Sequence, residues 1–194
     1  MLVKEMKKNL EAADVFEIWL DDMRVKGDLA VIQKFFKKPL IAKSDSLDML
    51  KRGVKAGMTY VDVPHGLPLD SEFRTLVKNK GTKVIVSYHN YEVTPTYNFL
   101  LDILEEMRET SADFFKIATH IHTEEDEQKL FDLLKELHFR GRLIVTGMGD
   151  NSRRVRIQAP VRGSVFYYAP INATLATAAG QLTRAELEKE WRTI

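Results

Sequence analysis

Short apolar runs rich in β-branched and aromatic residues alternate with longer amphipathic segments along the chain. Seven such runs predict strands buried on both faces, at residues 16–20, 39–43, 60–63, 83–88, 114–119, 142–147 and 164–169. Residues 46–57 and 123–141 instead carry apolar side chains at helical spacing, and Thr123 followed by acidic residues predicts a helix start. This alternation favours a parallel sheet, either doubly wound or closed into a barrel.

Two features favour the barrel. Neither G-x-G-x-x-G nor G-x-x-x-x-G-K-[ST] occurs, so the usual phosphate-binding loops of open nucleotide-binding sheets are missing. Polar residues also cluster at the carboxyl ends of several strands, at Asp21, Asp62, His89, Thr119 and 148–150, which is where barrel enzymes carry their chemistry. We therefore predict an α/β fold, a (β/α)8 TIM-type barrel formed by residues 1–194 as a single domain. Since eight strands are needed, the first would be missing, truncated, or formed by "MLVKEM" at residues 1–6.

Composition narrows the class of protein. The 194 residues, 44% of them hydrophobic, are enough for one sizeable core. The 29 Lys and Arg residues balance 28 Asp and Glu residues, which leaves no basic surface for nucleic acid. Cysteine is absent, and no stretch approaches the roughly 20 apolar residues of a membrane span. We expect a cytoplasmic protein that binds neither nucleic acid nor membrane.

A lysine stands inside one of the predicted buried strands, in "DFFKIATHIH" at residues 113–122. Strand alternation puts Lys116 on one face with Phe114 and Ala118, and His89 at the end of the preceding strand can point into the same pocket. A desolvated lysine loses its proton more easily, and the neutral amine attacks a ketone to form a Schiff base. A histidine beside it supplies an acid and a base near neutral pH. The pattern predicts carbonyl chemistry with proton abstraction at the adjacent carbon.

Other interpretations of these residues are open. Lys116 could extend to solvent or pair with a carboxylate, and His89 could be a hydrogen-bonded loop residue. His120 and His122 could suggest a metal site, but alternate positions at a strand end would put their rings on opposite sides, with no clear third ligand. We therefore expect no metal.

Four segments, in order, resemble the type I 3-dehydroquinate dehydratases, the Schiff-base dehydratases of the shikimate pathway of aromatic amino acid biosynthesis. They are "VIVSYHNYEVTP" at 84–95, "ADFFKIAT" at 112–119, "IVTGMGDNSRRVRI" at 144–157 and "ATLATAAGQLT" at 173–183. The resemblance runs from about Glu17 to Gln181. It implies a lyase that acts as a homodimer without cofactor or metal.

The resemblance also implies the roles of individual residues. Lys116 would form an imine with the C3 ketone of 3-dehydroquinate, and His89 would take a proton from C2 and protonate the departing C1 hydroxyl. The planar guanidinium of Arg156 would hold the substrate carboxylate. Gln181 would bind substrate oxygens from the last loop, and Glu17 would bind ring hydroxyls. Asp62 matches a family carboxylate near the histidine and would also belong to the substrate-binding residues.

Several positions depart from the family pattern. Trp19 and Asp45 stand where arginines would be expected, and Met49 stands where an acidic residue would pair with the catalytic histidine. Val155 replaces a serine before the binding arginine, and Ala179 replaces a proline in the last loop.

These losses leave alternatives to a dehydratase. Lys43 can supply positive charge, but an ammonium does not copy the fork of an arginine. A barrel that has kept the lysine could serve as a binding or regulatory protein with weakened or no turnover. A Schiff-base aldolase shares the lysine, but it does not account for the combination of His89, Arg156 and Gln181.

Overall fold

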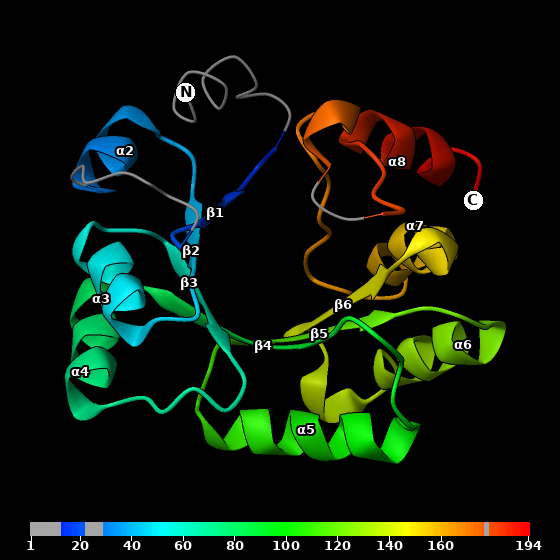
Figure 1. Ribbon diagram of the computed structural model, residues 1–194, viewed down its shortest axis with the longest axis horizontal. Helices are drawn as coiled ribbons and strands as arrows, with labels where there is room; N and C mark the ends of the chain where they lie inside the picture. The colour runs from blue at the N-terminus through cyan, green and yellow to red at the C-terminus, as the bar shows by residue number, and fades with distance from the viewer. Residues whose placement is uncertain (1–12, 22–28, 177–178) are drawn as a thin grey trace. The chain divides into compact units, whose positions relative to one another are not determined.

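The computed structural model describes residues 13–21, 29–176 and 179–194 (Figure 1). The chain forms two compact units, Met1–Val86 and Ser87–Ile194, and each is described by itself. Strands β1 to β6 follow the chain order in the sheet, and β4 begins in the first unit and ends in the second. The predicted extra strand at residues 1–6 lies outside the described residues. No helix among the described residues is long and apolar enough to cross a membrane.

The first unit repeats a strand followed by a helix. Its elements are β1 (Phe16–Trp19), α2 (Leu29–Phe35), β2 (Leu40–Lys43), α3 (Leu47–Lys55), β3 (Tyr60–Pro64), α4 (Ser71–Lys80) and the first half of β4 (Lys83–Asn90). The strands pair in parallel, with Trp19 opposite Lys43 and Lys43 opposite Asp62. All four residues of β2 are buried, as predicted for a strand covered on both faces.

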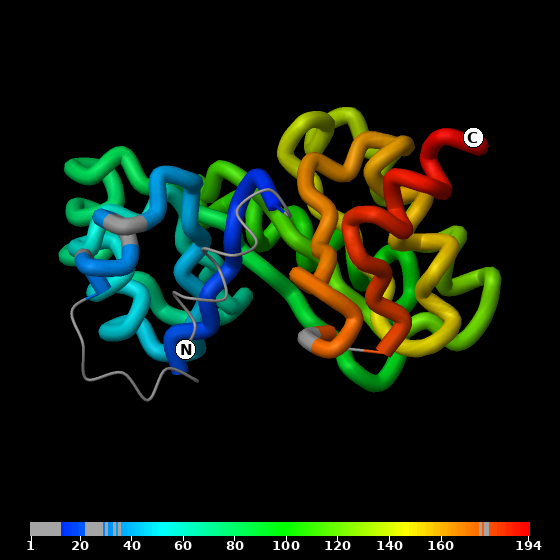
Figure 2. The backbone as a smooth tube through the Cα atoms, turned by 90° about the horizontal axis from the view of Figure 1, so that it is seen from above, coloured from blue at the N-terminus to red at the C-terminus, as the bar shows by residue number. Residues whose placement is uncertain are grey.

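The second unit continues the same pattern after β4. Its elements are α5 (Tyr97–Glu109), β5 (Phe114–His120), α6 (Glu124–Leu133), η2 (Leu137–Phe139), β6 (Leu143–Met148), η3 (Asp150–Ser152), α7 (Arg153–Val161), η4 (Ala173–Leu175) and α8 (Arg184–Trp191). β5 and β6 pair in parallel over six positions, from Phe115 with Leu143 to His120 with Met148. Figure 2 shows α8, in red, beside α7.

The helix predicted at residues 123–141 is shorter than expected. Thr123 caps α6 in a reciprocal arrangement with Asp126, which confirms the predicted start. The helix ends at Leu133, and the chain turns through η2 so that Phe139 can bury its ring against Phe115, at 5.6 Å between ring centroids. The apolar residues that continued the helical pattern therefore belong to a turn.

The prediction of a strand at residues 164–169 is wrong. Val165 N donates to Leu143 O, as it would between paired strands. Two positions further along β6, however, the Ser164 hydroxyl takes the place of a backbone carbonyl acceptor. Ser164 Oγ accepts from Val145 N and donates to Phe166 O. Because a side chain takes the hydrogen bond of β6, the segment lies beside the strand without joining the sheet, and the described residues contain six strands.

Candidate active site

Lys116 lies in the middle of β5 and is only 4% exposed. Its Nζ is 4.0 Å from the centroid of the Tyr168 ring, within the range of a cation–π interaction. Two residues earlier on the same face, Phe114 packs edge-on against Phe166 at 5.6 Å. The lysine therefore does not extend to solvent, and an aromatic ring covers its amine.

The Ser164 hydroxyl bonds and the packing of Tyr167 position this aromatic cover. Tyr167 contacts Trp191 of α8 at 4.9 Å between centroids, and Trp191 Nε1 donates to Ile157 O at 2.8 Å. In an extended segment alternate side chains point to opposite sides, so Tyr168 points back toward β5. Tyr168 was not among the predicted site residues, although alternation within residues 164–169 could have indicated it.

Arg156, from α7, is a buried cation at the same site. Its side chain is 6% exposed, and Nε donates to Ser152 Oγ at 3.2 Å. Burial lowers the pKa of Arg156 from 12.5 to about 10, so the guanidinium is still charged at neutral pH. Within the described part of the chain, no carboxylate forms an ion pair with Arg156, so its charge is available to an anionic ligand.

Tyr168 connects the lysine with the arginine. A small cavity of about 10 Å³ is lined by Tyr168 and Arg156, with Val145 and Thr146 of β6, Pro160 and Tyr167. Because the Tyr168 ring contacts Lys116 and lines this cavity, the amine and the guanidinium flank one aromatic side chain.

The segment that carries Gln181 packs against residues 149–152, just before α7, where Ser152 accepts a hydrogen bond from Arg156. Ser152 Oγ donates to Gly149 O at 2.6 Å and accepts from Arg156. A Cβ at Gly180 would lie 2.4 Å from Gly149 O and 2.6 Å from Ser152 Oγ, and its φ is +75°, so only glycine fits this contact. On the other side of Gln181, Leu182 is buried in a cluster with Ile157, the residue after Arg156. The backbone at Gln181 is thereby held close to the start of α7.

His89 lies at the carboxyl end of β4, where its ring stacks on Tyr91 at 5.9 Å. The following loop is tied to the end of β5, because Thr94 Oγ1 lies 2.8 Å from Thr119 Oγ1 and donates to His120 O at 2.7 Å. The second unit thus brings the carboxyl ends of β4 and β5 together.

Glu17 and Asp62 belong to the first unit. Asp62 is completely buried and lies 3.1 Å from the Nζ of Lys43, which is 3% exposed. The Lys43 Nζ also lies 5.2 Å from the Trp19 ring centroid. Glu17 is partly buried on β1, opposite Ile41 of β2. Asp45, two residues after β2, is exposed, so the charge directed inward at the end of β2 is the Lys43 ammonium, predicted only as a source of positive charge.

The two histidines after Lys116 do not face opposite sides, contrary to the prediction. The centroids of the His120 and His122 rings are 4.4 Å apart. Residues two apart in an extended segment lie on the same face, so the prediction misapplied strand alternation, which itself puts the two rings together. Among the described residues, no group of three or more His, Cys, Asp or Glu side chains could hold a metal ion.

The parallel α/β architecture, with a buried lysine and a buried arginine at one aromatic side chain, indicates the class of protein. It is an α/β protein whose site suits a small carbonyl compound that carries a negative charge.

Comparison with known proteins identifies the family. A sequence model of the type I 3-dehydroquinase family matches residues 33–194, so the chain belongs to that family. A 3-dehydroquinate dehydratase of Methanocaldococcus jannaschii is 27% identical, over 98% of this chain and 91% of that protein. One of Coxiella burnetii is 33% identical over 135 residues, which are 70% of this chain and 56% of that protein.

Solved structures of the family share the fold. The type I 3-dehydroquinate dehydratase of Clostridium difficile, solved with covalently modified comenic acid, superposes with a TM-score of 0.82 at 22% identity. The match covers 99% of this chain and 86% of that one. It confirms the prediction of a TIM-type α/β fold, although only six strands lie in the described residues.

Proposed function

We propose that the protein dehydrates 3-dehydroquinate to 3-dehydroshikimate through a Schiff base on Lys116, with His89 as the general acid and base. Membership of the type I family supports the overall reaction. The observation that carries the mechanism is the placement of a buried amine and a buried guanidinium at one aromatic side chain, Tyr168.

The proposed reaction begins with the neutral form of the lysine. The neutral amine of Lys116 attacks the C3 ketone, water leaves, and a protonated imine forms. His89 removes a proton from C2, and the electrons of that C–H bond move into the imine to give an enamine. The enamine then expels the C1 hydroxyl, which His89 protonates, so one water is released. Hydrolysis of the imine frees 3-dehydroshikimate and the amine.

The remaining residues bind the substrate. Arg156 would take the carboxylate, because it is a buried cation to which no described carboxylate is bonded. Gln181 would bind substrate oxygens from the segment packed on Gly149. Glu17 would contact ring hydroxyls, and Asp62, which is bonded to Lys43, would complete the set of substrate-binding residues.

We also propose that the protein works as a cytoplasmic homodimer without a cofactor, as the family resemblance implies. Light scattering at micromolar concentration tests the oligomeric state, and a monomeric mass would contradict it.

Mass spectrometry after borohydride reduction tests the mechanism. Protein incubated with 3-dehydroquinate and then reduced should carry one adduct, which peptide mapping should assign to Lys116. Lys116→Met should carry none, while Lys78→Met, a change on α4, should react like the unmodified protein. Dehydration without any trapped adduct would contradict the Schiff base. Trapping without dehydration would instead favour a binding protein that has kept the lysine.

A further inference from the structure

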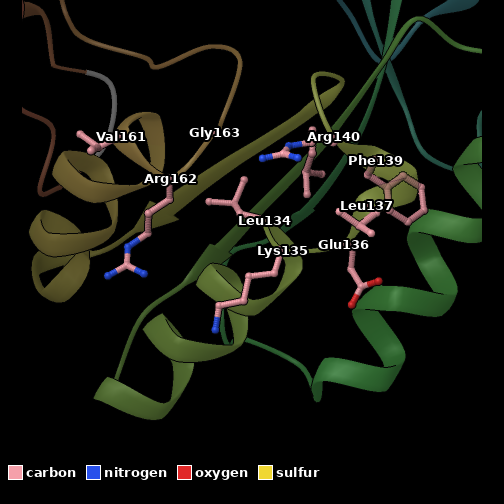
Figure 3. Close-up of a pocket in the computed structure, with 10 residues that line it drawn as sticks. Leu134, Lys135, Glu136, Leu137, Phe139, Arg140, Val161, Arg162 and Gly163 are labelled. Carbon is pink, nitrogen blue, oxygen red and sulfur yellow. The ribbon is translucent and has the colours of Figure 1, made fainter.

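A second cavity, whose lining residues are drawn in Figure 3, opens in the unit Ser87–Ile194. It lies on the other face of the sheet from Lys116. Leu143 lines it, whereas Lys116 pairs with the next residue of β6, Ile144, and strand alternation points these neighbours to opposite faces. The cavity has a volume of about 400 Å³, within the range of small-molecule sites. It shares no lining residue with the cavity at Arg156.

The cavity has apolar side chains on its rim. Leu137 of η2 is 75% exposed and Val161 at the end of α7 is 60% exposed, and both line the cavity together with Leu134 and Phe139. Apolar side chains that remain in water around a concave site are typical of a surface that binds a partly apolar ligand.

The charge available in this cavity is positive. Arg140 follows η2 and Arg162 follows α7, and Figure 3 shows the Arg162 guanidinium directed away from that of Arg140. Arg162 donates through Nε and Nη2 to the neutral amide oxygen of Gln158. Within the described chain, the Arg140 side chain has no hydrogen bond or ion pair. The Arg162 guanidinium also lies 4.4 Å from the centroid of the Phe131 ring, and, after the hydrogen bond from Lys135, its charge also lowers the pKa of the Asp132 carboxyl. Arg140 is therefore the cation of this cavity that remains available to a ligand.

The other two charged residues of the cavity are already engaged. Glu136 accepts a hydrogen bond from the hydroxyl of Tyr97, and Figure 3 shows its carboxylate directed toward α5. Burial and this carboxylate raise the pKa of Tyr97 to about 12, so the hydroxyl remains a donor at neutral pH. Lys135 Nζ is bonded to Asp132 at 2.6 Å. The charge left to a ligand is that of Arg140.

We propose that this cavity binds a small carboxylate that carries an apolar ring. The Arg140 guanidinium holds the carboxylate, for which its planar geometry is suited, and the ring covers Leu137 and Val161. The site is separate from the one that holds the lysine, and it does not depend on the proposed reaction.

Benzoate is a suitable probe, with benzyl alcohol as its neutral counterpart. Titration is followed by amide chemical shifts, in which Gly163 reports on this cavity and Gly149 on the Arg156 site. Benzoate should shift Gly163 with a dissociation constant on the order of 1 mM, and benzyl alcohol should bind at least about tenfold more weakly.

Variants separate the two sites. Arg140→Gln and Leu137→Ser should each weaken the Gly163 response by about tenfold, and Lys135→Gln, which removes an engaged cation of the same cavity, should change it less than about twofold. Arg156→Gln should abolish only a response at Gly149. No response at Gly163 up to about 50 mM benzoate would overturn the proposal. So would a Gly163 response that persists in Arg140→Gln, or one that inorganic phosphate reproduces at equal concentration.

Discussion

Replacement of Arg156 by methionine should stabilise the ligand-free protein while it removes turnover. Burial lowers the pKa of Arg156 from 12.5 to about 10, and the described residues supply no carboxylate partner. At about 1.4 kcal/mol per pKa unit, keeping this charge in the fold costs about 3 kcal/mol. Loss of the hydrogen bond to Ser152 costs about 1 to 2 kcal/mol in return. The net gain for Arg156→Met is therefore about 1 to 2 kcal/mol.

The pH at which this gain is measured follows from the direction of the shift. The pKa of Arg156 is lower in the folded protein than in the unfolded chain, so both states carry the proton below about pH 10 and the destabilisation is complete there. Wild-type stability recovers only as the pH rises through about 10 toward 12.5, where the folded state alone loses the proton. The difference between variant and wild type should therefore be constant between pH 6 and 8.

Thermal unfolding at neutral pH is the assay, with Arg154→Met as the matched control. Arg154 lies on the same helix but is half-exposed and bonded to Glu127 at 2.8 Å, so its replacement should not stabilise the protein. Arg156→Met should raise the midpoint by roughly 2 to 8 °C for a chain of this size. Quinate, a cyclic hydroxycarboxylate, should stabilise the wild type and not Arg156→Met. A variant less stable than the wild type would refute the reasoning, because the guanidinium would then stabilise the fold itself.

Three further predictions concern the lysines and the aromatic cover. Lys116→Met should reduce dehydration of 3-dehydroquinate to the uncatalysed rate, and turnover comparable to wild type would exclude the Schiff base. Tyr168→Leu should lower kcat by about 2- to 30-fold through loss of the cation–π contact with the lysine and its protonated imine, whereas Tyr168→Phe should retain most of the rate. Equal rates in both variants would show that the ring does not act on the amine. Lys43→Met should destabilise the protein by about 3 to 5 kcal/mol, because Asp62 loses its buried cation. Denaturant unfolding measures this loss, and Lys43→Met combined with Asp62→Leu should recover much of it; no recovery would contradict a charge-based origin.

The sequence was sufficient to locate the strands and the lysine. Continuous apolar runs identify β1 to β6 because strands of a parallel sheet are buried on both faces. The same pattern failed at residues 164–169, where the apolar residues are equally regular. There the decision depends on one hydroxyl, that of Ser164, which takes the hydrogen bond of Val145. Hydrophobic periodicity carries no information on that competition.

The partners of the site residues were less predictable than the residues themselves. The cover of Lys116 comes from Tyr168, about fifty positions later in the chain, and its place depends on the packing of Tyr167 on Trp191. Likewise, Lys43 is directed inward because its strand pairs with β3 at Asp62. Such contacts depend on register and tertiary packing, which a single sequence does not specify.

The division of the chain separates the proposed chemistry from part of the substrate recognition. Lys116, His89, Arg156 and Gln181 all belong to Ser87–Ile194, and Glu17 belongs to the other unit. Capture of a keto acid at the lysine should therefore need the arginine but not Glu17, for which the proposed role is to bind ring hydroxyls.

A ring ketone with a carboxylate and no hydroxyl groups, 3-oxocyclohexanecarboxylate, tests this separation. Borohydride should trap it on Lys116 in the wild type and in Glu17→Gln at similar rates, because this ketone offers no hydroxyl to Glu17. Arg156→Met should slow trapping by about tenfold or more, the loss expected when a buried charge-assisted hydrogen bond to the ligand is removed. Trapping that falls equally in Glu17→Gln and Arg156→Met would mean that residues of both units are needed to form the imine. In that case the departures at Trp19 and Asp45 would bear on the covalent step itself and not only on the recognition of hydroxyl groups.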